Sequence, residues 1–157
     1  GEDHQNDRVN IGSQIETVTR ASNKPILICS ESFKTPASYL IAFDGSKTAI
    51  KAAQMVANSE LLKGLQGYIV MVGNDNDTAK SSLAAVTEQL SSSGFTVTAH
   101  HLPYDDVVEG LVEFQANNAI DMIVIGAYGH SKFQHLFIGS TTTKIITKTL
   151  SPILLLR

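Results

Sequence analysis

Three glycines and a Ser-Thr pair stand at fixed intervals in the segment GAYGHSKFQHLFIGST, residues 126–141. The pattern is G-x2-G-x9-G-[ST], and it follows the apolar run DMIVI directly. Glycines let a backbone pass close to a ligand, and the free N–H groups of a first helical turn attract anions. Gly139, Ser140 and Thr141 stand where such a turn is expected. The pattern predicts a phosphate site, although a tight strand-to-helix turn with nothing bound would use the same glycines.

Other chemistry is poorly supported by the residues. Two common phosphate motifs, G-x-x-x-x-G-K-[ST] and G-x-G-x-x-G, do not occur, nor does a G-x-S-x-G elbow. No carboxylate pair stands out as a general acid and base, so no catalytic residue is assigned. Adjacent His100 and His101 on an expected strand point to opposite faces, which disfavours a shared metal. The acidic run at 75–77 lacks the glycine and glutamate of a calcium loop, and a helix cap is the better interpretation.

An alternating series of strands and helices must position the glycine segment. Short β-type runs are expected at 39–43, 67–72, 95–100, 121–126 and 153–156. Helical spacing of apolar residues is found in 46–63, 78–92, 105–117 and 140–149. The alternation predicts an α/β, Rossmann-like fold with an open, mainly parallel five-stranded sheet and helices on both faces. Ligands of such folds bind at the carboxyl ends of the strands, where the glycine segment begins.

The predicted helices have recognisable ends. N-terminal caps are expected at Ser46, Thr78, Asp105 or Asp106, and Ser140. Gly64 and Gly94 are expected just after two of the helices. Leu61 and Val107 are placed on buried helix faces by the same spacing.

Composition limits the possible classes of protein. A chain of 157 residues with 43% hydrophobic side chains can build one domain with a core. The net charge of −3 argues against a nucleic-acid partner. No run approaches the roughly 20 apolar residues that span a bilayer, and the N-terminus lacks signal-peptide features, so a cytoplasmic protein without a membrane partner is expected. Cys29, in the run ILICS, is expected to be a buried core residue in a reducing compartment.

An internal repeat relates the two ends of the chain. GSQIETVTRASNKPILI (12–28) aligns without a gap on GSTTTKIITKTLSPILL (139–155). Any helix followed by Pro and a strand looks similar, but the shared Gly-Ser and Pro-Ile-Leu at equal spacing favour a duplication. We therefore expect residues 1–37 to be the final helix and strand of a preceding domain plus a linker. Residues 38–157 are expected to form a complete domain.

Together with Asp44 at the end of the first strand of this domain, the glycine pattern resembles the ATP-binding class of the universal stress protein family. The resemblance covers residues 38–157, and about 10–30 as the tail of a tandem partner domain. It implies an adenine nucleotide alpha hydrolase-like fold and a site for ATP or another adenine nucleotide with magnesium. The N-terminal copy lacks the glycine pattern and is not expected to bind ATP.

The resemblance also assigns roles to single residues. Asp44 would hold the ribose or adenine, and Val72 would meet the adenine through its backbone. Gly126 and Gly129 would line the ribose and first phosphates. The outer phosphates would be bound by Gly139, Ser140 and Thr141, and the pocket wall would include Ala42, Ala127 and Tyr128. His130 follows the second glycine, where the family often has a basic or small polar residue, and Lys132 could supply the missing charge.

The family implies a nucleotide-binding regulatory module of a stress response. Two alternatives remain open: a slow ATPase or phosphotransferase on the same scaffold, and a dimerising interaction module with a vestigial nucleotide site. The run ILLL at 153–156 would be an apolar sheet edge, and the resemblance implies a homodimer or an intramolecular pseudo-dimer through it. Residues 25–29 are therefore expected to dock beside residues 152–156.

Overall fold

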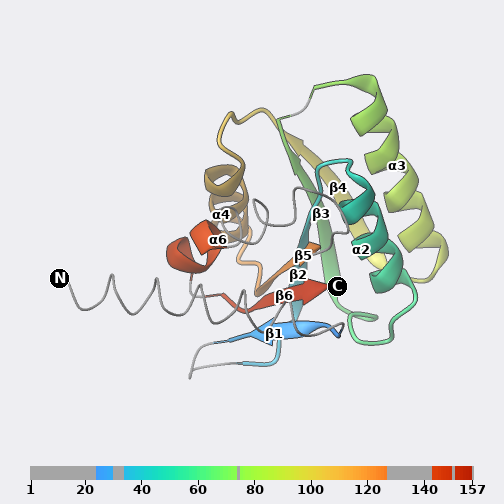
Figure 1. The fold of residues 1–157 in the computed structure, drawn as a ribbon. Helices are drawn as coiled ribbons and strands as arrows, with labels where there is room; N and C mark the ends of the chain where they lie inside the picture. Colours follow the sequence, from blue (N-terminus) through green and yellow to red (C-terminus); the bar gives the residue numbers. More distant parts are fainter. Residues whose placement is uncertain (1–23, 30–33, 74, 127–142, 150, 157) are drawn as a thin grey trace.

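The computed structural model describes residues 24–29, 34–73, 75–126, 143–149 and 151–156 (Figure 1). The strands are β1 (Ile26–Ile28), β2 (Ser38–Ala42), β3 (Gln66–Val72), β4 (Thr96–Leu102), β5 (Met122–Gly126) and β6 (Ile153–Leu156). The helices are α2 (Lys47–Ala57), α3 (Asp77–Ser92), α4 (Val107–Asn117) and α6 (Thr143–Lys148). This is the alternating order that the sequence predicts.

All six strands form one sheet in the order β1-β6-β5-β2-β3-β4. The five predicted strands pair in parallel, and β1 adds a sixth strand that runs antiparallel to β6. In that pair Ile26 lies opposite Leu155, and Ile28 lies opposite Ile153. The predicted docking of residues 25–29 beside the last strand is therefore confirmed, and β6 is an inner strand rather than an edge.

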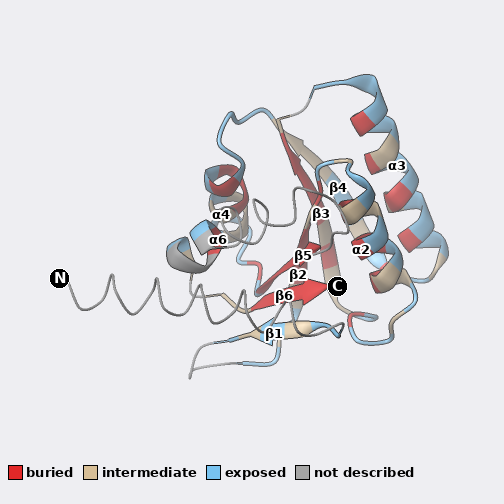
Figure 2. Ribbon diagram, in the orientation of Figure 1, coloured by how far each residue is buried: buried red, intermediate tan, exposed pale blue. Residues whose placement is uncertain are grey.

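Helices cover both faces of the sheet. Helices α2 and α3 lie on one face, and α4 and α6 lie on the other (Figure 1). Side chains of β2 alternate between the two layers, since Tyr39 and Ile41 pack with α2 and α3 while Leu40 packs with α4. Figure 2 shows the buried residues concentrated on the central strands and on the inner sides of the helices. No helix in the described part of the chain is long and apolar enough to cross a bilayer.

Three helices begin with a side-chain cap. Ser46 Oγ accepts from Ala49 N at 3.1 Å, and Asp106 Oδ1 accepts from Glu109 N at 2.9 Å, as predicted. The prediction for α3 is wrong, because Asn76 rather than Thr78 is the cap, with Oδ1 accepting from Ala79 N at 2.7 Å. Asn76 has extended backbone angles, which place its side chain over the first free N–H groups. The predicted cap at Ser140 lies outside the described residues.

Helix α2 ends earlier than the apolar spacing predicts. Asn58 N–H bonds back to Gln54 O and closes the helix, and Ser59 Oγ then accepts from Leu61 N at 3.1 Å. Such a local side-chain bond competes with helical hydrogen bonding. Leu61 is consequently 66% exposed, and the next residue, Leu62, is buried in its place. Gly64 lies in the following turn rather than at the helix end, whereas Gly94 follows the α3 cap with a φ of +89° as predicted.

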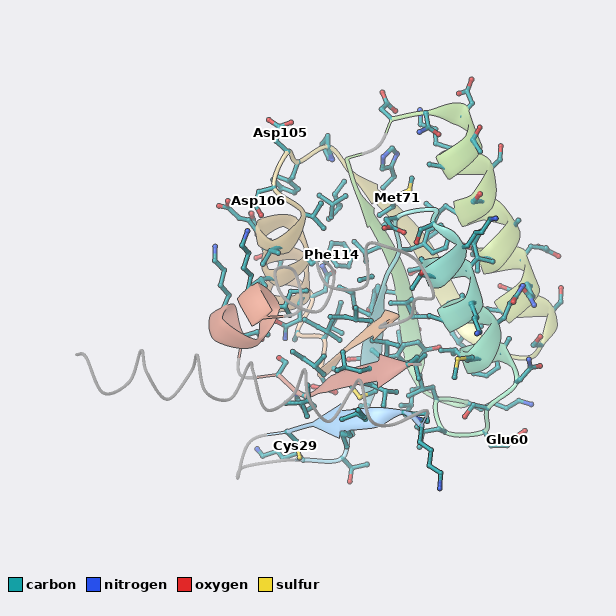
Figure 3. All side chains as sticks on the ribbon, in the orientation of Figure 1. Cys29, Glu60, Met71, Asp105, Asp106 and Phe114 are labelled. Atoms are coloured by element: carbon teal, nitrogen blue, oxygen red, sulfur yellow. The ribbon has the colours of Figure 1, made fainter. Side chains whose placement is uncertain are left out.

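Cys29 is exposed, so its predicted burial is wrong. It follows β1, the edge strand of the sheet, and Figure 3 shows its side chain at that edge. Ile26 and Ile28 of this strand pack against the core, while Leu27 between them is 45% exposed. An apolar run alone does not reveal how far each face of a strand is covered.

Candidate functional site

A cavity of about 180 Å³ opens at the carboxyl ends of β2, β3 and β5. Strand β2 is the switch point of the sheet, because the chain proceeds from β2 to β3 and β4 on one side and returns to β5 on the other. Parallel α/β sheets bind ligands in the crevice that such a reversal creates. The lining residues are Ala42, Phe43, Asp44, Ser46, Thr48, Ala49, Val70, Val72, Val107, Leu111, Ile125, Gly126 and Ile145.

The wall next to α2 is polar. It contains Asp44, in the turn after β2, together with Ser46 and Thr48 at the start of α2. Ser46 N donates to Asp44 Oδ1 at 2.9 Å, so the backbone of the turn holds the carboxylate in place. This wall offers a carboxylate and two hydroxyls, which can accept hydrogen bonds from a ligand.

The opposite wall is apolar. This wall is formed by Val107 and Leu111, one turn apart on α4, and by Ile145 of α6. Leu111 and Ile145 are fully buried, whereas Val107 is 45% exposed at the first position of α4. The predicted burial of Val107 is therefore wrong, because the residue lies at the rim of the cavity rather than in the core. The pocket can hold a ligand that has an apolar face on one side and hydrogen-bond donors on the other.

Two glycines allow helices to pack closely on the strand ends that line the cavity. A Cβ on Gly126 would lie 3.0 Å from Ala52 Cβ and 3.1 Å from Thr48 O, so this glycine lets α2 approach the end of β5. A Cβ on Gly110 would lie only 2.9 Å from Val72 Cγ1, so α4 packs tightly on the end of β3. Gly126 therefore has a packing role, in addition to its predicted contact with a ligand.

The predicted site residues divide into two groups. Ala42, Asp44, Val72 and Gly126 all line the cavity, and the ligand contacts that the resemblance implies for them stay predictions. The remaining predicted site residues, with the neighbouring Lys132, lie outside the described residues: Ala127, Tyr128, Gly129, His130, Gly139, Ser140 and Thr141.

Sequence reasoning missed most of the helical contribution to the cavity. Thr48 lies only four residues after Asp44, at the start of α2. This closeness in sequence to a predicted site residue could have assigned Thr48 to the site. Leu111 and Ile145 carry no such signal, because an inward apolar residue on a helix is first a core residue.

A second cavity, of about 410 Å³, lies at the ends of β3 and β4. Asp75 on its rim pairs with Lys80 at 2.6 Å, and this hydrogen bond, together with the positive charge, holds the pKa of Asp75 below its usual range. A ring nitrogen of His101 contacts Gly73 O, while His100 packs against Phe114 of α4 with ring centroids 4.8 Å apart. The two histidines thus point in opposite directions, as predicted. In the described part of the chain no three His, Cys, Asp or Glu side chains could hold a metal ion together.

Comparison with known proteins agrees with this architecture. The model of the universal stress protein family matches residues 39–157. Universal stress protein Slr1230 of Synechocystis sp. is 37% identical over 149 residues, which cover 94% of this chain and 52% of that protein. The chain thus spans about half the length of this curated relative.

Solved structures share the fold at low sequence identity. A universal stress protein from Archaeoglobus fulgidus DSM 4304 has a TM-score of 0.68 at 21% identity, and the match covers 90% of this chain and 52% of that one. The universal stress protein from Archaeoglobus fulgidus in complex with dAMP has a TM-score of 0.59 at 19% identity, covering 80% of this chain and 100% of that one.

Proposed function

The chain belongs to the universal stress protein family, and on this premise we propose that its sheet-edge pocket binds an adenine nucleotide and that the domain acts as a stress-response regulatory module. One observation carries the proposal. Asp44, Val72 and Gly126, which the family resemblance assigns to the site and which follow or end three different strands, line one cavity at the switch point of the sheet. A structural neighbour with the same fold was solved in complex with dAMP, which supports an adenine nucleotide as the ligand class.

The two walls of the cavity suit the two parts of a nucleoside. The apolar wall of Val107, Leu111 and Ile145 can pack against the face of the base. The polar wall places the Asp44 carboxylate where it can accept from ribose hydroxyls or from the base. The backbone of Val72, at the end of β3, would meet the edge of the adenine.

ATP with magnesium is the nucleotide that we propose for this site. Its phosphates would be held by the glycine pattern. Gly126 and Gly129 would line the ribose and the first phosphates, and the outer phosphates would be bound by Gly139, Ser140 and Thr141. None of the described lining residues is basic, so the phosphate charge calls for a metal ion as well as backbone N–H groups. Oxygen donors are the ligands that magnesium prefers, and those on the polar wall come from Asp44, Ser46 and Thr48.

We also propose that residues 1–37 are the last helix and strand of a preceding stress-protein domain, followed by a linker. In the repeat alignment Leu27 corresponds to Leu154, and these two residues face each other in the ladder between β1 and β6. Antiparallel pairing centred on equivalent residues is the geometry of a two-fold symmetric contact. The strand pair therefore supports an intramolecular pseudo-dimer of two related domains, and relatives of about twice this length agree with it.

Calorimetry with ATP and magnesium tests the nucleotide site, after a check for nucleotide that co-purifies with the protein. We expect micromolar binding by the wild type and a loss of about tenfold or more for Asp44→Asn, because a hydrogen bond to a charged group contributes about 1.5–3 kcal/mol. Glu113→Gln, which changes an exposed carboxylate on α4 outside the cavity, is the matched control and should bind normally. The double variant Gly129→Val with Ser140→Ala should abolish binding. A folded, nucleotide-free wild type that binds neither ATP nor AMP would refute the proposal.

A further inference from the structure

We propose that Gln115 is a positioning residue that sets the spacing between the two helices of the apolar pocket wall. The inference rests on the proposed nucleotide site and concerns how that site keeps its shape. Gln115 lies near the carboxyl end of α4, outside the cavity, and its side chain is half-buried. Both ends of its amide are used in hydrogen bonds that connect different elements.

The side chains of Gln115, Thr149 and Ser151, together with the backbone N–H of Ser151, close a ring of hydrogen bonds. Gln115 Nε2 donates to Ser151 Oγ at 2.6 Å, and Ser151 N donates to Thr149 Oγ1 at 3.1 Å. Thr149 Oγ1 donates in turn to Gln115 Oε1 at 3.4 Å. The ring joins the end of α4 to the connection between α6 and β6.

Gln115 also holds the entry to β5. Its Nε2 donates to Ile120 O at 2.6 Å, and its backbone carbonyl accepts from Ile120 N at 3.0 Å. The two Nε2 hydrogens and the Oε1 atom therefore all have partners, as a half-buried amide requires. Replacing this side chain by an apolar one removes three hydrogen bonds. It takes away the Gln115 partner of Ile120 O, of Ser151 Oγ and of the Thr149 hydroxyl.

The ring lies one helical turn from the pocket on both helices. Leu111 precedes Gln115 by four residues on α4, and Ile145 precedes Thr149 by four residues on the α6 side. Thr149 N donates to Ile145 O at 3.0 Å, so a displacement of Thr149 would also displace the backbone of Ile145 in the pocket wall. Residues four apart on a helix lie on one face, so the ring fixes the helix spacing directly below the two wall residues.

The test combines nucleotide affinity with a measure of helix order. ATP with magnesium is titrated calorimetrically into the wild type, Gln115→Leu, Thr149→Val and Thr149→Ser. We expect Gln115→Leu and Thr149→Val to lower the affinity by about tenfold or more, because small displacements of positioned groups have large effects. Thr149→Ser retains the hydroxyl and should keep most of the wild-type affinity. Hydrogen exchange of the Thr149 amide should accelerate in the two variants that break the ring.

Thr87→Val is the control for a purely structural effect. Thr87 Oγ1 donates to Leu83 O at 2.7 Å within α3, so this change also removes a half-buried hydroxyl without changing side-chain volume. Its affinity for ATP should equal that of the wild type. If the wild type binds and Gln115→Leu binds within twofold of it, or if Thr87→Val loses affinity equally, the positioning role is wrong while the proposed function stands. If the wild type binds no nucleotide, the proposed function itself fails, and the inference fails with it.

Discussion

Tyr39 combines complete burial with a hydroxyl group that has no hydrogen-bond partner among the described residues. Its ring lies against the backbone of Gly67, since a Cβ at that position would come within 2.5 Å of Tyr39 Cζ and Oη. Burial raises the pKa of Tyr39 to about 12, from an ordinary value of 10.0. These features make Tyr39→Phe the most informative single substitution for the core.

The expected effect is a gain in stability. An unsatisfied buried polar group costs about 1–3 kcal/mol, whereas the lost dispersion contacts of one oxygen atom contribute about 0.1–0.2 kcal/mol each. We therefore expect Tyr39→Phe to raise the free energy of unfolding by about 1 kcal/mol at pH 8. Because the ring remains, the close contact with Gly67 is retained.

The pH dependence gives a second, independent test. The folded state holds the tyrosine proton more tightly than the unfolded chain, so this stabilisation is complete below pH 10 and is lost as the pH rises through 12. A pKa difference of two units between the folded and the unfolded state contributes about 2.7 kcal/mol to the free energy of unfolding. About half of this contribution is lost at pH 11. The stability advantage of Tyr39→Phe over the wild type should thus increase by about 1.4 kcal/mol between pH 8 and pH 11.

Urea unfolding followed by circular dichroism at pH 8, 10 and 11 measures both effects. Other groups titrate equally in the two proteins, so the difference between them isolates Tyr39. Tyr104→Phe, at a largely exposed tyrosine, is the control and should change stability by less than about 0.5 kcal/mol. A Tyr39→Phe protein that is less stable by 1 kcal/mol or more, with no pH-dependent difference, would show that the hydroxyl has a partner and would refute the reasoning.

Three further experiments test the packing, the added strand and the cap. Gly67→Ala should lower the free energy of unfolding by about 1–3 kcal/mol in urea titrations, because its Cβ would overlap the tyrosine ring; an unchanged midpoint would contradict this contact. The double variant Ile26→Asp with Ile28→Asp should clearly lower the free energy of unfolding, since both side chains pack on the core. A change in that free energy within about 0.5 kcal/mol would show that β1 does not contribute to stability. Asn76→Ala should cost about 1 kcal/mol, whereas Thr78→Ala should be nearly neutral; the reverse order in thermal melts would restore Thr78 as the cap.

The order of strands and helices follows from local patterns. Each strand of the domain is a short β-type run, and its observed ends lie within two residues of the predicted ones. The docking of β1 was also predictable, because the repeat identified residues 26–28 as the counterpart of β6 and the family resemblance implied that two such strands pair. The strand order and the repeat depend on side-chain period and self-similarity, which a single sequence contains in full.

The errors arise where two local signals compete. Thr78 and Asn76 can both cap a helix, and only the backbone angles of the loop decide between them. Leu61 continues the helical spacing of α2, but a serine side chain bonds to its backbone after the helix has ended. Cys29 has the apolar neighbours of a core strand, and its exposure depends on which strand lies at the edge of the sheet.

By itself, the sequence determined the fold class and the sheet edge at which the cavity opens, because the order and the ends of the strands follow from local patterns. Only the tertiary structure decided which helices enclose the pocket. Leu111 and Ile145 are separated by more than thirty residues and have the inward apolar character of ordinary core positions. They form one wall because α4 and α6 pack on the same face of the sheet, and this contact between distant segments leaves no spacing signal in the chain.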